Sequence, residues 1–303
     1  MRNLPGKKLC RRRVRLTEVF ARGVIYGAAS LSALFLAGIL GTVFRKGASA
    51  LKPSFLAEAS DLLRGTTGVG GNLVNTGYIL LLTLAFAVPA GTGGAIWLSE
   101  YARPGRLVQT VEFAVDILAG IPSILFGLFG YVFFGSLGLG YSLLRGSLTL
   151  SMMVLPLILR STGEALREVP ESYRQGALAL GAGKWDMIRT VLLPAAAPGI
   201  LTGVILAAGR ILGESAALLL TAGSAGGLPE AGDGFFVFLK GLGNKLFQSG
   251  GTLTVALYLQ MQNGRYEAAF GIGCLLILIS GMLEAGKGML SHVWRKAGTG
   301  GRE

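Results

Sequence analysis

The feature that most constrains this chain is a series of long stretches without a single charged residue. The longest runs from Gly65 to Ser99, and its apolar part begins near Leu73. A bilayer core about 30 Å thick needs roughly 20 apolar residues per helix, and several stretches approach that length. Only 15% of the residues are charged and 51% are hydrophobic, whereas soluble domains carry about a quarter charged residues. The sequence therefore predicts an all-α integral membrane protein.

Six transmembrane helices are predicted from these stretches, of which the fourth and the sixth are the least defined in length. The stretches cover residues 23–44, 65–99, 117–144, 146–159, 190–209 and 268–283. Pro122 and Ser123 are expected to break the third helix. Segment 246–264 is also uncharged, but it carries several Gln and Asn residues and is predicted to be extracytoplasmic or interfacial.

The distribution of Lys and Arg predicts an orientation. The 28 Lys and Arg against 16 Asp and Glu give a net charge of +12. A cytoplasmic N-terminus places most of the basic residues inside, as the positive-inside rule requires, and assigns eight to the outer side, with Arg145 in an outer loop. The basic segment 1–22 is then cytoplasmic, and 23–44 is an uncleaved first helix, because its apolar run exceeds that of a signal peptide. An extracytoplasmic loop at 45–71, a transmembrane core at 72–290 and a cytoplasmic tail at 291–303 complete the arrangement expected in the plasma or inner membrane.

The motif content argues against an enzyme. The chain has no G-x-x-x-x-G-K-[ST] loop to cradle ATP phosphates and no G-x-S-x-G nucleophile motif. One His and two Cys residues leave no His/Cys metal site and no disulfide framework. We therefore expect no catalytic residue, no metal and no cofactor. The energy for any transport must come from a gradient or from a partner protein.

A long amphipathic segment separates the fourth and fifth predicted helices. It covers residues 161–200, and its first half is crowded with charged side chains. Gly181 and Gly183 predict a break between two short helices. Beyond the break, Met187 and Val191 resume a helical apolar face. The segment is therefore expected to be a structured cytoplasmic loop.

This loop resembles the EAA motif of ABC importer permeases. In that motif E-A-A is followed after three residues by Gly, after nine more by Ile, and after one more by Leu-Pro. The spacing is met throughout, although Gln stands in the Glu position and Gly in the first Ala position. The matching residues are Gln175, Gly176, Ala177, Gly181, Val191, Leu193 and Pro194. The resemblance implies a coupling loop at 163–194 that docks on an ATPase subunit.

Three further stretches are similar to PstA-type permeases of phosphate importers, a MetI-like family. They are GGAIWLSEYA at 93–102, DILAGIPSILFGLFGY at 116–131 and AGRILGESAALLLTAG at 208–223, where Ala217 replaces a Pro common in the family. The similarity runs from about residue 70 to 290. It implies a six-helix MetI-like core, a PstC-like permease as heterodimer partner, two PstB-like ATPase subunits that bind the ATP, and a PstS-like phosphate-binding protein. Membrane lipid is the expected surrounding, and no nucleic acid partner is expected.

Three charged residues are candidates for the substrate pathway. Arg210 and Glu214 lie at i,i+4 in the fifth predicted helix, which permits a salt bridge on one face. A structural ion pair and an anion-pathway role both remain open. An Arg near mid-bilayer costs at least about 2.5–3.5 kcal/mol, and a crossing phosphate needs a compensating positive charge. Arg160 ends the fourth predicted helix, where a snorkelling Arg is the alternative to a pathway role.

Two other functions compete with phosphate import. The same architecture could carry another oxyanion such as molybdate or sulfate. A gradient-driven secondary transporter is the alternative from a different class, but it would need inverted repeats and broken helices at matching positions. The chain shows no internal repeat, and that alternative does not explain the EAA spacing.

Overall fold

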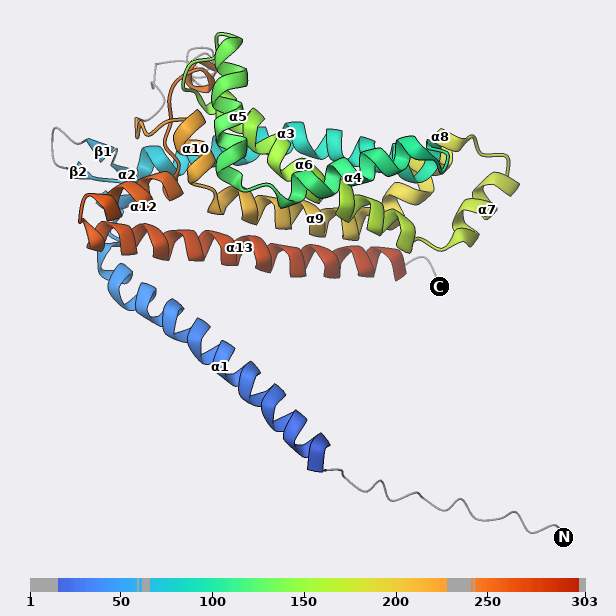
Figure 1. Cartoon of the computed structure of the whole chain (residues 1–303), viewed down its shortest axis with the longest axis horizontal. Coiled ribbons are helices and arrows are strands. Elements are labelled where there is room, and N and C mark those ends of the chain that lie inside the picture. Colours follow the sequence, from blue (N-terminus) through green and yellow to red (C-terminus); the bar gives the residue numbers. More distant parts are fainter. Residues whose placement is uncertain (1–15, 59, 62–65, 228–240, 242, 300–303) are drawn as a thin grey trace. The chain divides into compact units, whose positions relative to one another are not determined.

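The computed structural model describes residues 16–58, 60–61, 66–227, 241 and 243–299 (Figure 1). It divides into two units, Met1–Arg45 and Lys46–Glu303. The described part of the first unit belongs to helix α1 (Leu16–Gly47), whose side chains are exposed from Phe20 to Ile39. A helix that is hydrophobic on all sides is typical of a membrane span. The helix predicted at 23–44 is present and longer, and most of the predicted basic segment lies outside the described residues.

The start of the second unit holds short elements where a plain loop was predicted. A single 3₁₀ turn, η1 (Ala48–Ala50), leads to α2 (Pro53–Ala57). Strand β1 (Ser60–Asp61) then pairs antiparallel with β2 (Thr66–Thr67). Pro53 suits the first turn of α2, because its missing N–H would have no helical partner there. The remainder of the described unit consists of helices and the loops that connect them.

Among the described residues, five helical segments are long and apolar enough to cross a membrane, or six if one bent pair counts as a span. The five are Phe20–Ala50, Gly70–Tyr101, Leu143–Glu168, Lys184–Gly213 and Tyr266–Gly288. They include α3 (Gly70–Ile96) with its π-helical end η2 (Trp97–Tyr101), α6 (Leu143–Glu168), α9 (Leu193–Gly213) and α13 (Tyr266–Thr299). The shorter α12 (Leu253–Gln262) covers most of the polar segment 246–264 and packs against α3 and α13.

The third predicted span is a sharply broken pair of helices. Helices α4 (Arg106–Gly120) and α5 (Ser123–Ser136) meet at an angle of 105°. The predicted break is therefore present, because Pro122 lacks the N–H that would continue the helix. The predicted ends of this span are wrong: α4 begins before 117, α5 ends at Ser136, and residues 143–144 already belong to α6.

Small and hydroxyl-bearing residues bring the central helices close together. Thr83 of α3 and Ser151 of α6 bond to each other's helix: the Thr83 hydroxyl donates to the Ser147 carbonyl at 3.4 Å, and the Ser151 hydroxyl donates to the Thr83 carbonyl at 3.2 Å. Gly91 of α3 lies where any side chain would meet Ile158 of α6. Such contacts replace the hydrophobic driving force that is missing between helices in lipid. The buried core accordingly lies between α3, α6, α9 and α10 (Ala216–Thr221).

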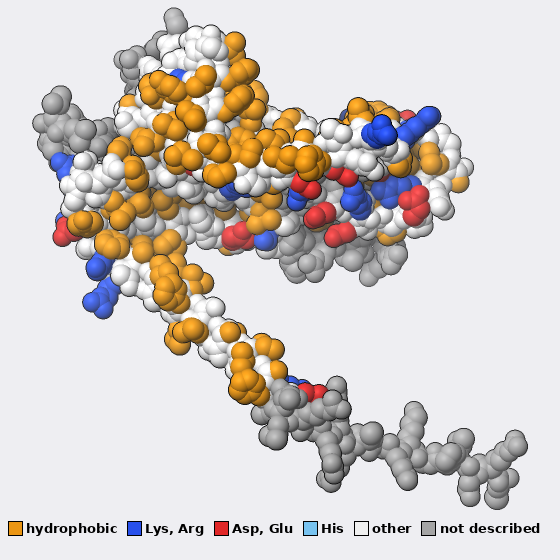
Figure 2. Space-filling model, viewed as in Figure 1, with side chains coloured by type: hydrophobic (Ala, Val, Ile, Leu, Met, Phe, Trp, Pro, Cys, Tyr) orange, Lys and Arg blue, Asp and Glu red, His pale blue; other side chains and the backbone are white. Residues whose placement is uncertain are grey.

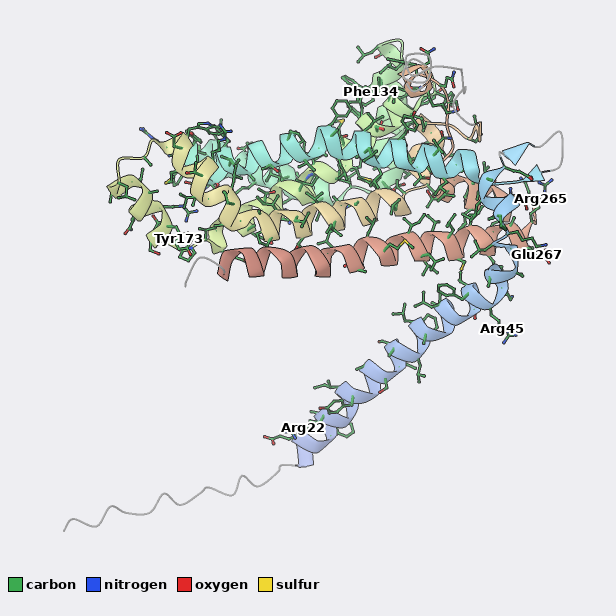
Figure 3. All side chains as sticks on the ribbon, turned by 180° about the vertical axis from the view of Figure 1, so that it is seen from behind. Arg22, Arg45, Phe134, Tyr173, Arg265 and Glu267 are labelled. Carbon is green, nitrogen blue, oxygen red and sulfur yellow. The ribbon has the colours of Figure 1, made fainter. Side chains whose placement is uncertain are left out.

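The segment predicted as a coupling loop forms the end of the second unit opposite α12 (Figure 1). It consists of α7 (Glu171–Ala179), α8 (Lys184–Met187) and the π-helical turn η3 (Ile188–Leu192), which continues into α9. Tyr173 marks this end, and Arg265 and Glu267 mark the other (Figure 3). The predicted break between two short helices is present at residues 180–183. The fourth predicted helix, by contrast, runs on through the first charged residues of the loop to Glu168.

Candidate functional site

Arg210 lies in the last turn of α9, on the face that the chain leaves exposed. Pro198, Leu206 and Gly209 are exposed on the same helix. Arg210 forms no ion pair with any residue that the structure describes. A charged side chain in a membrane span normally faces a bundle interior or a water-filled cavity. Within the described residues, this face of α9 therefore presents an unpaired cation.

Glu214 does not pair with Arg210 in the described structure, although their i,i+4 spacing would permit a salt bridge on a continuous helix. Helix α9 ends at Gly213, so the two residues do not share a helix. Glu214 is buried instead, and its Oε1 accepts a bond from the Ala217 N–H at 3.1 Å at the start of α10. Its carbonyl accepts a bond from the Thr254 hydroxyl at 2.6 Å. The carboxylate thus stabilises the turn between α9 and α10.

Arg160 lies on α6 beside the acidic side chains of α4. It forms an ion pair with Asp116, and about two turns further along α6 Arg167 lies 3.5 Å from Glu112. These residues and Glu164 line a cavity of about 300 Å³ between α3, α4 and α6. Arg160 is therefore neither buried in the core nor next to Arg210, and the structure does not join the three predicted pathway residues into one site.

The residues of the EAA-like motif lie on two adjacent arms. Gln175, Gly176 and Ala177 are on α7, and only Ala177 is half-buried against the core of the loop. Gly181 takes a positive φ of 83° at the break, a backbone conformation that glycine adopts without a Cβ penalty. The second arm holds Val191, Leu193 and Pro194, at the passage from η3 into α9. The arms touch, because α7 contacts η3.

Large apolar side chains are exposed on the loop. Leu180 is 90% exposed, and Tyr173, Leu178 and Trp185 are also exposed. Beneath them, Leu166, Ile188 and Leu192 are fully buried and hold the loop on α6 and α9. Charged side chains gather around this end of the unit, as Figure 2 shows. A firmly seated loop with an apolar exposed face is the arrangement expected of a docking surface.

Two basic residues that the sequence reasoning did not single out hold this loop to α3. Arg174 of α7 donates to Glu100 of η2, with N···O distances of 3.0 and 3.2 Å. The Lys184 ammonium of α8 lies 4.8 Å from the centroid of the Tyr101 ring. Glu100 and Arg174 are 74 positions apart in the chain, so no local pattern could pair them.

A third basic residue, Arg145, was predicted to lie in an outer loop but is 3% exposed at the start of α6. Its side chain donates to the carbonyl of Gly130 at 3.2 Å and to that of Tyr131. The guanidinium also lies against the rings of Tyr131 and Tyr141, 4.8 and 5.6 Å from their centroids. A guanidinium against aromatic ring faces is stabilised by cation–π attraction. Arg145 therefore ties α5 to α6.

Lys245 is a buried cation outside the candidate spans. Its ammonium donates to the carbonyl of Gly227 at 2.7 Å, and burial lowers the pKa of the side chain. The Asn75 amide nearby in the fold donates to the carbonyls of Ala225 and Gly251 at 3.2 and 3.1 Å. These bonds fasten the segment after α10 onto the start of α3.

The helical bundle with its firmly seated two-armed loop defines the chain as a multi-span helical membrane protein. Residues 87–283 match the family described as binding-protein-dependent transport system inner membrane component. The chain belongs to this family of ABC importer permeases.

Named relatives agree with this assignment. The chain is 37% identical over 210 residues to a probable ABC transporter permease protein, YqgI, of Bacillus subtilis, covering 69% of this chain and 71% of the relative. It is 36% identical to the phosphate transport system permease protein PstA of Xylella fastidiosa (strain Temecula1), covering 68% and 75%. It is 34% identical to PstA of Haemophilus influenzae, covering 66% and 71%.

Solved transporters share the fold. An inward-facing structure of the MetNI methionine ABC transporter matches with a TM-score of 0.53 at 20% identity, covering 77% of this chain and 95% of that one. A bacterial ABC transporter involved in the import of alginate matches with a TM-score of 0.58 at 16% identity, covering 92% and 98%. The MetI-like importer fold predicted from the sequence is thus confirmed.

Proposed function

We propose that the chain is the permease subunit of an ATP-driven importer that moves inorganic phosphate into the cytoplasm. The observation that carries this proposal is the 36% identity over 215 residues to a phosphate transport permease. The chain itself hydrolyses no ATP in this scheme. Two PstB-like ATPase subunits supply the energy, a PstC-like permease completes a heterodimer, and a PstS-like protein delivers the phosphate.

The exposed face of α9 is the proposed wall of the phosphate pathway. Arg210 projects from a helix whose neighbouring residues are apolar or small, and no described residue neutralises it. An interior cation lowers the barrier for a desolvated anion, because the effective dielectric is low there. The partner permease would close the pathway over this face. Glu214 then acts on the pathway indirectly, by fixing the turn that follows Arg210. Arg160 contributes to the pathway from the cavity between α3, α4 and α6, which Asp116 also lines.

The loop at 163–194 is the proposed contact with an ATPase subunit. Its exposed Tyr173, Leu178 and Leu180 lie between two candidate spans, and the exposed Trp185 lies at the start of the second of these spans. Together they form an apolar face, and such faces mark interaction sites. The EAA-like residues shape this face: Gly181 turns the chain, and Gln175 and Gly176 lie on the exposed side of α7. A loop fixed on α6 and α9 can pass closure of the ATPase dimer to the spans as a rigid-body motion.

This scheme requires the loop and both termini to lie in the cytoplasm. Ser172 on α7 and Ser54 on α2 are both exposed, so cysteines at these positions can be labelled where reagent reaches them. With Cys10→Ser, an impermeant thiol reagent applied to intact cells should label Ser54→Cys and leave Ser172→Cys unmodified. Labelling in the reverse pattern would overturn the orientation.

The substrate is tested by uptake of labelled phosphate into cells with and without the gene. We expect gene-dependent uptake that excess unlabelled phosphate suppresses and excess molybdate or sulfate does not. Suppression by molybdate or sulfate instead would assign the other oxyanion. Arg210→Gln should abolish uptake at normal membrane levels, whereas Arg210→Lys should retain part of it, since the charge persists without the bidentate fork.

A control separates the pathway role of Arg210 from a structural one. If Arg210 served only as a counter-charge for Glu214, replacing both residues by Gln would restore transport. The structure gives the two side chains different surroundings, so the double variant should remain inactive. Substantial rescue by the double variant would refute the pathway role.

A further inference from the structure

The π-helical turn η2 at the end of α3 is contacted by both arms of the loop. α7 reaches it through Arg174 and Glu100, and α8 reaches it through Lys184 and Tyr101. π-Helical turns are rare and occur frequently at functional sites. The same turn follows directly on a 27-residue helix that packs along α6 and α9. One turn of α3 is thus attached to two separate helices of the loop.

Arg174 is bound more completely than a surface ion pair. Besides its two bonds to Glu100, the guanidinium donates to the carbonyl of Leu166 at 2.9 Å and to that of Val169 at 3.1 Å. Arg174 is 16% exposed and Glu100 is 7% exposed. An Arg fork has five donors in a fixed geometry, so one side chain joins the ends of α3 and α6 to α7.

Glu171 provides an internal comparison. It also lies near Arg174, at 3.4 Å, but it is 66% exposed and belongs to the same helix, α7. Exposed pairs of this kind contribute little, because water screens the charges. The Glu100 contact is shielded from water and crosses between helices, so it is the contact that can transmit a displacement of α7.

We propose that Arg174 and Glu100 are a positioning pair that makes α3 follow the loop, with Lys184 and Tyr101 as the second attachment. The proposal rests on the proposed coupling function of the loop. When an ATPase subunit displaces α7, the buried ion pair carries the displacement into η2 and so into α3. A helix of this length reaches across the bilayer core at 1.5 Å per residue, which takes the motion to the opposite end of the permease.

The experiment uses the complete importer, with its partner permease, ATPase subunits and binding protein, in proteoliposomes. The quantity measured is the number of phosphate ions moved per ATP hydrolysed. Arg174→Gln and Glu100→Gln should each lower this ratio by about 2- to 30-fold, the range typical of residues that carry coupling. The double variant should be no worse than the single ones, and Arg174→Lys should lie in between. Glu171→Gln removes only the exposed contact within α7 and is the comparison variant: it should lower the ratio by less than either Arg174→Gln or Glu100→Gln.

A merely structural role predicts another result. Poor assembly would lower phosphate transport and ATP hydrolysis together and leave their ratio unchanged, and that outcome would overturn the proposal. Failure of the wild-type complex to move phosphate would instead count against the proposed substrate.

A second measurement tests the pair without reference to substrate. Gly93 of α3 is exposed with open space around its Cβ position, and Ser172 of α7 is exposed, so both accept spin labels as cysteines. The distance between the labels should stay the same when ATP binds to the wild-type complex. With Arg174→Gln it should shift or broaden on ATP binding. An equally constant distance in the variant would contradict the positioning role.

Discussion

Close packing between α6 and α9 makes Gly203 a sensitive position. A Cβ added to Gly203 would lie 1.8 Å from the Ser161 Oγ and 2.5 Å from its Cβ, distances that force the helices or the Ser161 side chain to shift. Gly209, about two turns along the same helix, has open space around its Cβ position. Gly203→Ala and Gly209→Ala therefore make the same chemical change in two different surroundings.

The difference between the two variants isolates the packing cost. Both gain helix propensity, up to about 1 kcal/mol, so this contribution cancels in the comparison. Overpacking costs about 1–3 kcal/mol, and only Gly203→Ala incurs it. In domains somewhat smaller than this chain, 1 kcal/mol shifts the unfolding midpoint by about 2–4 °C. We therefore expect the Gly203→Ala midpoint to lie about 2–12 °C below that of Gly209→Ala.

Cys274 supplies the assay, because it is a free cysteine buried in α13. In a Cys10→Ser background, a thiol-reactive dye reports the temperature at which Cys274 becomes accessible in detergent. Adding Ser161→Gly to Gly203→Ala removes both clashing atoms and should restore most of the midpoint. Equal midpoints for Gly203→Ala and Gly209→Ala, or no effect of Ser161→Gly, would refute this account of the helix contact.

Three further outcomes are expected. Gly181→Val should leave membrane levels normal but reduce transport-driven ATP hydrolysis, because a β-branched residue is strained at a φ of 83°; unchanged uptake would argue against a coupling role. Arg145→Met should lower the unfolding midpoint, because the variant loses about 1–3 kcal/mol of stability when the buried Gly130 carbonyl loses the Arg145 donor. The control Arg265→Met, at an exposed position, should leave the midpoint unchanged. Burial lowers the pKa of Lys245 below its ordinary 10.5, so the unfolded chain binds more protons between the two pKa values. Stability should rise with pH across that window in the wild type, and a thermal scan of Lys245→Met should lack that rise.

Local sequence signals predicted much of the fold. The apolar runs identified the membrane helices, because the length and hydrophobicity of a run can be read from the sequence without knowing what the helix packs against. Pro122 and Gly181 correctly predicted changes of chain direction. Pro122 restricts the backbone and lacks an N–H, whereas Gly181 can adopt a positive φ. Helix ends were predicted less well. α6 continues to Glu168 because charged residues such as Glu164 can extend a helix beyond its apolar run.

The contacts of charged residues could not be derived from spacing alone. Arg210 and Glu214 stand at helical spacing, but the chain leaves the helix between them. Arg174 and Glu100 form a buried pair across 74 positions, which only the tertiary placement of α7 beside η2 creates. Arg145 was assigned to a loop from its charge, yet the carbonyls of α5 and two tyrosine rings stabilise it inside the fold.

The central claim is that this permease moves phosphate at the expense of ATP hydrolysed by its partners. The most direct measurement is accumulation of labelled phosphate in proteoliposomes that contain the complete importer, with no ion gradient imposed. We predict accumulation that requires ATP and binding protein, stops with a non-hydrolysable ATP analogue and is insensitive to ionophores. Accumulation driven by an imposed ion gradient in the absence of ATP would contradict the account and favour a secondary transporter.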